Sequence, residues 1–214
     1  SGCGKTTLLH VCAGLLPLQD GALENSFPRT AVMFQQPRLL PWKTTRDNIV
    51  LGLKALGRDR AERDAQAAAM AHAVGLEPAA LEQFPHQLSG GMQSRVALLR
   101  ALVVQPQLLL MDEPFSALDY QQANAVAVLM ITHDLIEAVR LADTLMVMAA
   151  EPGRIVHVLE LERPALERDD AYIHDQTARL LAVPSVRDSF GLSPLKGGMN
   201  GGRAAPQGQG RLTC

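Results

Sequence analysis

The first seven residues of the chain have the types and spacing that hold a phosphate group. They read Ser-Gly-Cys-Gly-Lys-Thr-Thr and fit the last part of the pattern G-x-x-x-x-G-K-[S/T]. Glycines at positions 2 and 4 let backbone N–H groups wrap a phosphate, and the helix that begins there adds a partial positive charge. Lys5 would then reach the β- and γ-phosphates, and the Thr6 hydroxyl would hold Mg²⁺. The other interpretation is a turn of small residues before a helix.

Two adjacent acids end an apolar run in the middle of the chain. Residues 108–111 read Leu-Leu-Leu-Met and are followed by Asp112 and Glu113. Four consecutive apolar residues predict a buried strand, and open α/β sheets bind their ligands at the carboxyl ends of such strands. We therefore expect Asp112 to coordinate Mg²⁺. The alternative is an acidic pair that begins an exposed loop.

A second candidate anion site precedes that strand, where residues 88–92 read Leu-Ser-Gly-Gly-Met. Ser89 can cap a helix, and the free N–H groups and dipole at a helix N-terminus attract an anion. A simple cap explains Ser89 but leaves Gly90 and Gly91 unexplained, because glycines weaken a helix start unless a backbone must approach closely.

The elements that must position these residues are strands and helices in alternation. Buried strands are expected at residues 29–35, 108–111, 126–131, 144–148 and 154–161. Helices are expected at residues 6–13, 135–142 and 169–182, and residues 45–105 are expected to be mostly helical. Because the apolar runs are continuous rather than alternating, they indicate a mostly parallel sheet covered on both faces. The predicted fold class is therefore α/β.

Length and composition restrict the class of protein. At 214 residues the chain suits one domain with a smaller insert. Its 22 acidic and 20 basic residues leave no basic footprint, so we expect no nucleic-acid partner. The three cysteines show no metal or disulfide spacing, and no apolar stretch approaches the roughly 18 residues of a membrane span. With no signal peptide evident, we expect a cytoplasmic domain that reaches a membrane through a partner.

Taken together, the glycine-rich run, residues 88–92 and the two acids resemble the nucleotide-binding subunit of an ATP-binding-cassette (ABC) transporter. The resemblance runs from Ser1 to about residue 160. It implies a P-loop NTPase core, with a mostly parallel sheet flanked by helices, at residues 1–42 and 106–183, and a helical signature subdomain at residues 43–105. Residues 184–214 are rich in Gly, Pro, Ser and Gln, which predicts a disordered tail.

The resemblance also implies ATP and Mg²⁺ as cofactors and gives individual residues a role. It implies that Glu113 is the general base and that His133, at the end of an apolar strand, binds the γ-phosphate. Gln35 resembles the glutamine that contacts Mg²⁺ and water, and a buried amide at a strand end is the alternative. The implied Mg²⁺ ligands are Thr6, Gln35 and Asp112. The implied nucleotide-binding residues are Ser1, Gly2, Cys3, Gly4, Lys5, Thr6, Thr7, Ser89, Gly90, Gly91 and Asp119, the last through contact with an opposite subunit.

Two further stretches resemble the importer branch for nitrate, sulfonate and taurine. Residues 35–42 read Gln-Gln-Pro-Arg-Leu-Leu-Pro-Trp, and residues 152–155 read Pro-Gly-Arg-Ile. The implied function is ATP hydrolysis that energises import of such a solute, at the cytoplasmic face of the membrane. The implied partners are a second ATP-binding subunit in a head-to-tail dimer, permease subunits and, indirectly, a solute-binding protein. The alternatives are a catalytically impaired nucleotide-binding fragment or assembly module, and a soluble ABC ATPase outside transport.

The sequence departs from the family pattern in several places. The strand expected before the phosphate loop would precede Ser1, and residues 115–125 leave little room for the crossover helix that relatives carry. Residues 92–95 read Met-Gln-Ser-Arg, where relatives more often have a basic residue followed by Gln. From the short crossover we expect weak or absent ATPase activity and poor solubility. Trp42 could pack within the helical insert or face a permease, and we favour packing.

Overall fold

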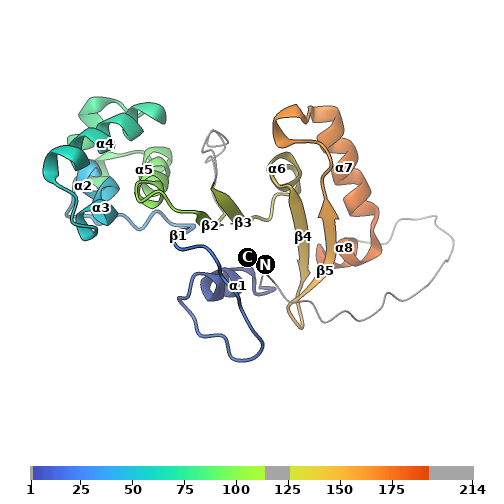
Figure 1. Cartoon of the computed structure of the whole chain (residues 1–214). Helices are drawn as coiled ribbons and strands as arrows, with labels where there is room; N and C mark the ends of the chain where they lie inside the picture. The colour runs from blue at the N-terminus through green and yellow to red at the C-terminus, as the bar shows by residue number, and fades with distance from the viewer. Residues whose placement is uncertain (1, 114–125, 193–214) are drawn as a thin grey trace. The chain divides into compact units, whose positions relative to one another are not determined.

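The computed structural model describes residues 2–113 and 126–192 of the chain. It contains a three-stranded parallel sheet. Its strands are β1 (Thr30–Met33), β2 (Leu108–Asp112) and β3 (Ala127–Ile131), in the order β1-β2-β3 (Figure 1). The central strand β2 is buried along its whole length, which explains its continuous apolar sequence. The predicted parallel arrangement is thus confirmed for these strands.

The three strands end together at one edge of this sheet. The register pairs Met33 with Met111 and Asp112 with Ile131. Residues 113–126 connect β2 to its parallel neighbour β3, and residues 114–125 of that connection lie outside the described residues. The expectation of a short crossover therefore stays a prediction.

Between β1 and β2 the chain is helical, as expected. The helices are α2 (Thr45–Ile49), α3 (Leu51–Ala55), α4 (Arg60–Ala73) and α5 (Gly90–Leu102), with the short 3-10 helices η1 (Pro78–Glu82) and η2 (Pro85–Gln87) before α5. Thr44, Asp59 and Ser89 cap α2, α4 and α5, because each side-chain oxygen accepts a hydrogen bond from a backbone N–H in the first turn.

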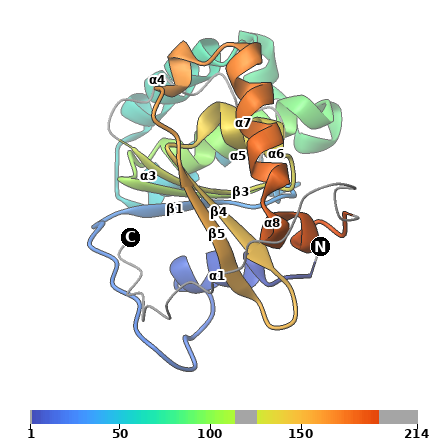
Figure 2. The ribbon, with the colours of Figure 1, turned by 90° about the vertical axis from the view of Figure 1, so that its right-hand side faces the viewer.

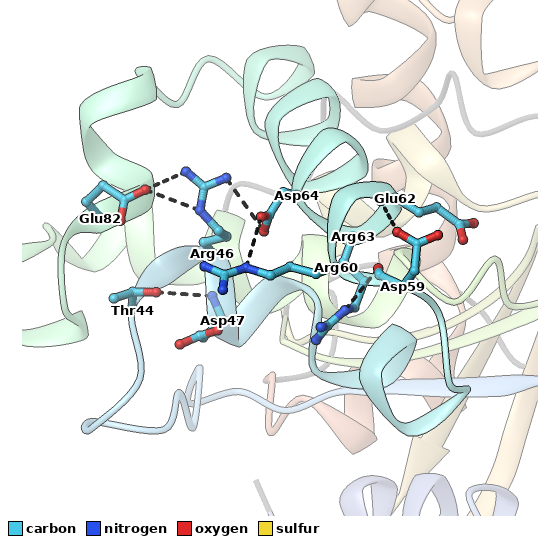
Figure 3. Close-up of polar contacts among 9 residues, drawn as sticks. All are labelled: Thr44, Arg46, Asp47, Asp59, Arg60, Glu62, Arg63, Asp64 and Glu82. Carbon is cyan, nitrogen blue, oxygen red and sulfur yellow. Dashed lines mark hydrogen bonds and ion pairs between the residues drawn. The ribbon is translucent and has the colours of Figure 1, made fainter.

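Arg46 of α2 joins α4 and η1 through a group of charged side chains (Figure 3). Its Nε donates to Glu82 over 3.2 Å, its Nη2 also contacts Glu82, and its Nη1 lies 3.9 Å from Asp64. The hydrogen bond to Glu82 is the main reason that the pKa of Arg46 is raised above its ordinary value. Because these side chains are partly exposed, the pairs orient the helices more than they stabilise the fold.

Helix α5 belongs to two hydrophobic cores at once. Val96, Leu99 and Val103 pack with α2, α3, α4 and η1, whereas Leu98, Ala101 and Leu102 pack against the sheet. For this reason the helical segment and the sheet form one unit, residues 9–131. The domain boundaries expected at residues 42 and 105 stay a prediction.

Among the described residues, a second unit contains residues 2–8 together with residues 132–192. Helix α1 (Lys5–Cys12) begins in it, and α6 (Leu135–Leu141), β4 (Thr144–Ala149), β5 (Arg154–Glu160), η4 (Ala165–Glu167), α7 (Asp170–Ala182) and α8 (Pro184–Ser189) follow in the later part of the chain. Strands β4 and β5 form an antiparallel hairpin, and α6, α7 and α8 pack with it (Figure 2). Val139, Leu145, Ile173 and Leu180 lie in the core between them.

The beginning of the expected tail differs from the prediction. Residues 184–189 form α8, and the side chain of Val186 is fully buried in the core of the second unit. Composition alone does not reveal this contact, because it depends on the partner surface on β4 and β5. Residues 193–214 lie outside the described residues. Within residues 2–113 and 126–192, no helix has the length and apolar character needed to cross a bilayer.

Candidate functional site

The glycine-rich run at the start of the chain forms a loop that leads directly into α1. Gly2 and Gly4 have φ values of 95° and 89°, a left-handed conformation that glycine adopts without the steric cost of a side chain. The N–H of Leu8 donates to the carbonyl of Gly4 over 2.9 Å, so the helix begins at the end of the loop. The hydroxyl-bearing residues Thr6 and Thr7 are exposed. Ser1 lies outside the described residues.

Cys3 is the buried residue within the described part of this loop, with 8% of its surface exposed. The Lys5 ammonium donates to its sulfur over 3.2 Å. Burial raises the pKa of the Cys3 thiol, but the hydrogen bond and charge of Lys5 lower it by more, so that the pKa lies below its ordinary value. Gly153, in the turn between β4 and β5, lies so close that an added Cβ would be 2.6 Å from the Cys3 carbonyl oxygen.

The two acids that end β2 and the glutamine after β1 lie together at the carboxyl edge of the sheet. The Gln35 amide nitrogen donates to Oε2 of Glu113 over 2.8 Å. The Glu113 N–H donates to the Ile131 carbonyl over 2.8 Å, and its φ is 46°. A non-glycine residue in the left-handed region is strained, and such strain concentrates at functional sites. The structure therefore brings together two of the three expected catalytic residues.

Asp112 is nearly enclosed at the same edge, with 7% of its surface exposed. In the part of the chain that the structure describes, no three His, Cys, Asp or Glu residues gather closely enough to hold a metal. The expected Mg²⁺ ligands, a carboxylate from Asp112, an amide oxygen from Gln35 and a hydroxyl from Thr6, are all hard oxygen donors. This set fits Mg²⁺, which usually takes one or two carboxylates and completes its shell with phosphate oxygens and water.

The residues at the start of α5 are exposed and have space around them. Ser89 accepts a hydrogen bond from the Met92 N–H over 3.3 Å, so the predicted cap is confirmed. A Cβ added at Gly90 or Gly91 would meet nothing within 4 Å, so no contact with the described residues requires glycine there. Gln93 donates to the carbonyls of Pro85 and Leu88 and so anchors the segment before the helix.

His133 follows β3 and immediately precedes the cap of α6. The Asp134 carboxylate accepts hydrogen bonds from the N–H groups of Ile136 and Glu137, and the Thr132 hydroxyl donates to Glu137 over 2.7 Å. These bonds hold the backbone on both sides of His133, whose side chain is exposed.

The expected site residues are divided between the two units. The phosphate loop and His133 belong to one unit, and Gln35, Asp112, Glu113 and residues 89–91 belong to the other. Asp119 lies outside the described residues.

Two polar residues beside this site were missed by the sequence analysis. The Arg100 guanidinium donates to the carbonyls of Pro37 and Arg38, and the fully buried Asn48 side chain bonds both backbone groups of Leu40. For Arg100 the available signal was an arginine within the otherwise apolar stretch of residues 96–102. The expectation that Trp42 packs within the helical insert is wrong, because 69% of this side chain is exposed.

Comparison with known proteins gives a consistent set of matches. A family described as ABC transporter matches residues 1–116. The taurine import ATP-binding protein TauB of Rhizobium johnstonii is 43% identical over 182 residues, covering 76% of this chain and 69% of that protein. The aliphatic sulfonates import ATP-binding protein SsuB 2 of Frankia alni is 41% identical over 208 residues, covering 91% of this chain and 80% of the relative.

A solved structure is also similar to this chain. It is the dimeric post-hydrolysis state of the ATP-binding cassette MJ0796 bound to ADP and Pi, with a TM-score of 0.63 and 26% sequence identity. The similarity covers 75% of this chain and 82% of that one. The α/β architecture with a parallel sheet and flanking helices agrees with the expected fold class.

Proposed function

The chain belongs to the ABC transporter family, and from this premise we propose that it is the ATP-hydrolysing subunit of an importer for taurine or a related sulfonate. The observation that carries the proposal is the contact between Gln35 and Glu113 at the carboxyl end of β2, beside Asp112. This edge of an open α/β sheet is where ligands bind. The names of the similar TauB and SsuB proteins support the choice of solute.

In the proposed reaction, the loop of residues 1–7 binds the phosphates of ATP through its backbone N–H groups and Lys5. Glu113 accepts a proton from the water that attacks the γ-phosphorus, the bond from the γ-phosphorus to the bridging oxygen breaks, and ADP leaves with that oxygen. Gln35 orients the Glu113 carboxylate through their hydrogen bond. His133 contacts the γ-phosphate. Mg²⁺ held by Thr6, Gln35 and Asp112 would neutralise charge on the phosphate oxygens.

The proposed active form is a head-to-tail dimer on the cytoplasmic side of a permease. The open space around Gly90 and Gly91 supports the approach of a ligand carried by a second copy, and Asp119 is proposed to contact that copy. The dimeric ATP-binding cassette with a similar fold supports the same assembly. A permease and a solute-binding protein are proposed as further partners, because the relatives are named as import proteins.

Isothermal titration with MgATP tests the proposal at its first step. We expect Lys5→Ala to lose measurable binding, because it removes the charge that meets the phosphates. Lys54→Ala, which removes an exposed lysine from α3, is the control and should bind like the parent. Equal affinity in Lys5→Ala and the parent would contradict the assignment of the loop. Steady ATP turnover by the parent would separate a working ATPase from an impaired binding module.

A further inference from the structure

Arg100, in the last turn of α5, is bonded to the loop that follows β1. Its Nη1 donates to the carbonyl of Arg38 over 2.8 Å, and its Nη2 donates to the carbonyl of Pro37 over 2.7 Å. Burial lowers the pKa of this guanidinium, and no ion pair with a carboxylate accompanies it among residues 2–113 and 126–192. A planar guanidinium can bind two neighbouring carbonyls in one fixed orientation.

The loop that Arg100 holds has a strained backbone. Arg38 has a φ of 43°, which a side chain disfavours and which persists only when neighbouring contacts impose it. The Arg38 guanidinium lies over the ring of Phe34, 4.6 Å from its centre. From the other side, Asn48 accepts from the Leu40 N–H over 2.8 Å and donates to the Leu40 carbonyl over 3.2 Å. The loop is thus fixed between α5 and α2.

Gln35 lies immediately before this fixed segment and donates to Glu113. We infer that Arg100 is a positioning residue: by holding the carbonyls of Pro37 and Arg38, it keeps the Gln35 amide against the Glu113 carboxylate. Arg100 thus links α5, whose first turn Ser89 caps, to the residue proposed as the general base. The expected effect on catalysis rests on the proposed function, whereas the role of Arg100 in holding the loop does not.

A tryptophan next to the held carbonyls reports on this segment without any nucleotide. The single tryptophan of the chain, Trp42, lies between Leu40 and Lys43, which Asn48 holds independently of Arg100. The reporter chain therefore carries Trp42→Phe and Gln36→Trp, at the exposed position before Pro37. Arg100→Met keeps the apolar stem of the side chain and removes both hydrogen bonds, so the fluorescence anisotropy of the tryptophan at position 36 should fall. Arg95→Met is the matched control, because Arg95 also lies on α5 but bonds the Val74 carbonyl after α4. Equal anisotropy in the reporter chain with and without Arg100→Met would overturn the inference.

Turnover tests the consequence for Glu113. In Arg100→Met we expect kcat to fall about tenfold or more, since small misplacements of reacting groups cost up to about 10²-fold, while KM for ATP changes less than about twofold. Arg100→Lys should recover part of the loss, because it keeps the charge without the planar fork. Adding Arg100→Met to Gln35→Ala should cost little further, because both act through one contact.

The remaining outcomes are also decisive. Additive losses of kcat in the double variant would overturn the inference, since Arg100 would then act independently of Gln35. A lowered urea midpoint with normal kcat would assign Arg100 to folding alone and would equally overturn it. If the parent hydrolysed no ATP, the proposed function would fail, and the anisotropy of the reporter chain would still decide whether Arg100 holds the loop.

Discussion

At the scale of single residues, the strongest chemical argument concerns Glu113. Its backbone is held in a left-handed conformation by the hydrogen bond to Ile131, and Gln35 donates to its carboxylate. Glu113→Gln keeps the shape and removes the basic oxygen. We therefore expect MgATP binding to persist while turnover falls by about 10²-fold or more, the usual range for the loss of a general base.

Phosphate release at saturating ATP, together with titration of MgATP, measures both parts of this prediction. Glu77→Gln is a suitable control, since Glu77 is exposed before η1 and its side chain does not cap that helix. Unchanged turnover in Glu113→Gln would remove Glu113 from the proposed mechanism. Loss of binding in the same variant would show that the carboxylate acts on the nucleotide itself.

The sequence could predict those site residues that stand in short motifs or directly after buried strands. Gln35 and Glu113 were expected from separate stretches, and the structure joins them through a hydrogen bond. Arg100 and Asn48 could not be found in this way, because their partners are backbone carbonyls and N–H groups of the loop that follows β1. Those partners depend on how α2 and α5 pack, and any residue type can provide a backbone carbonyl.

At the scale of secondary-structure elements, Arg168 controls how α6 ends. This side chain is 7% exposed and donates to the carbonyls of Val139 and Ala142, each over 2.8 Å, and to that of Arg163 over 2.6 Å. The last carbonyls of a helix lack partners within the helix and carry partial negative charge, which suits a guanidinium. We expect Arg168→Met to lower the free energy of unfolding by about 2 kcal/mol or more, because buried acceptors lose their donors.

Urea denaturation followed by circular dichroism measures this change. Arg179→Met in α7 is the control: Arg179 is 72% exposed and pairs with Asp175 one helical turn away, so its loss should cost at most about 0.5 kcal/mol. Equal stability in the two variants would contradict a role for Arg168 in ending α6. The comparison uses the same substitution at Arg168, between η4 and α7, and at Arg179 within α7. It therefore compares a buried arginine that bonds carbonyls with an exposed one that does not.

The elements themselves were largely predictable, because apolar runs and capping residues are local signals. Strands β2, β4 and β5 lie close to their expected ranges, and Ser89 caps α5 as expected. Helix α8 was missed because its one fully buried residue, Val186, is surrounded by polar neighbours in sequence. The double role of α5 was also missed, since a helix that packs on two cores shows no single apolar stripe.

At the scale of the whole molecule, the residues proposed to bind one ATP belong to two copies of the chain. Each copy provides a phosphate loop with Lys5 and a helix start with Gly91. A Cβ at Gly91 meets nothing within 4 Å, so Gly91→Asp should fold normally and repel a γ-phosphate brought by the other copy. Lys5→Ala should instead prevent a copy from bringing ATP at all.

The head-to-tail arrangement makes a prediction about mixtures, best measured in the Glu113→Gln background, where bound ATP is not consumed. Either variant alone should stay monomeric in MgATP, because each of its composite sites contains the same defect. In an equal mixture, one copy keeps Lys5 and the other keeps Gly91, so a mixed dimer has one intact site. We expect light scattering after size exclusion to detect a dimer in the mixture alone. A dimer in either variant alone would contradict ATP binding between two copies. The absence of a dimer in the mixture would contradict it too, provided that the Glu113→Gln chain itself dimerises.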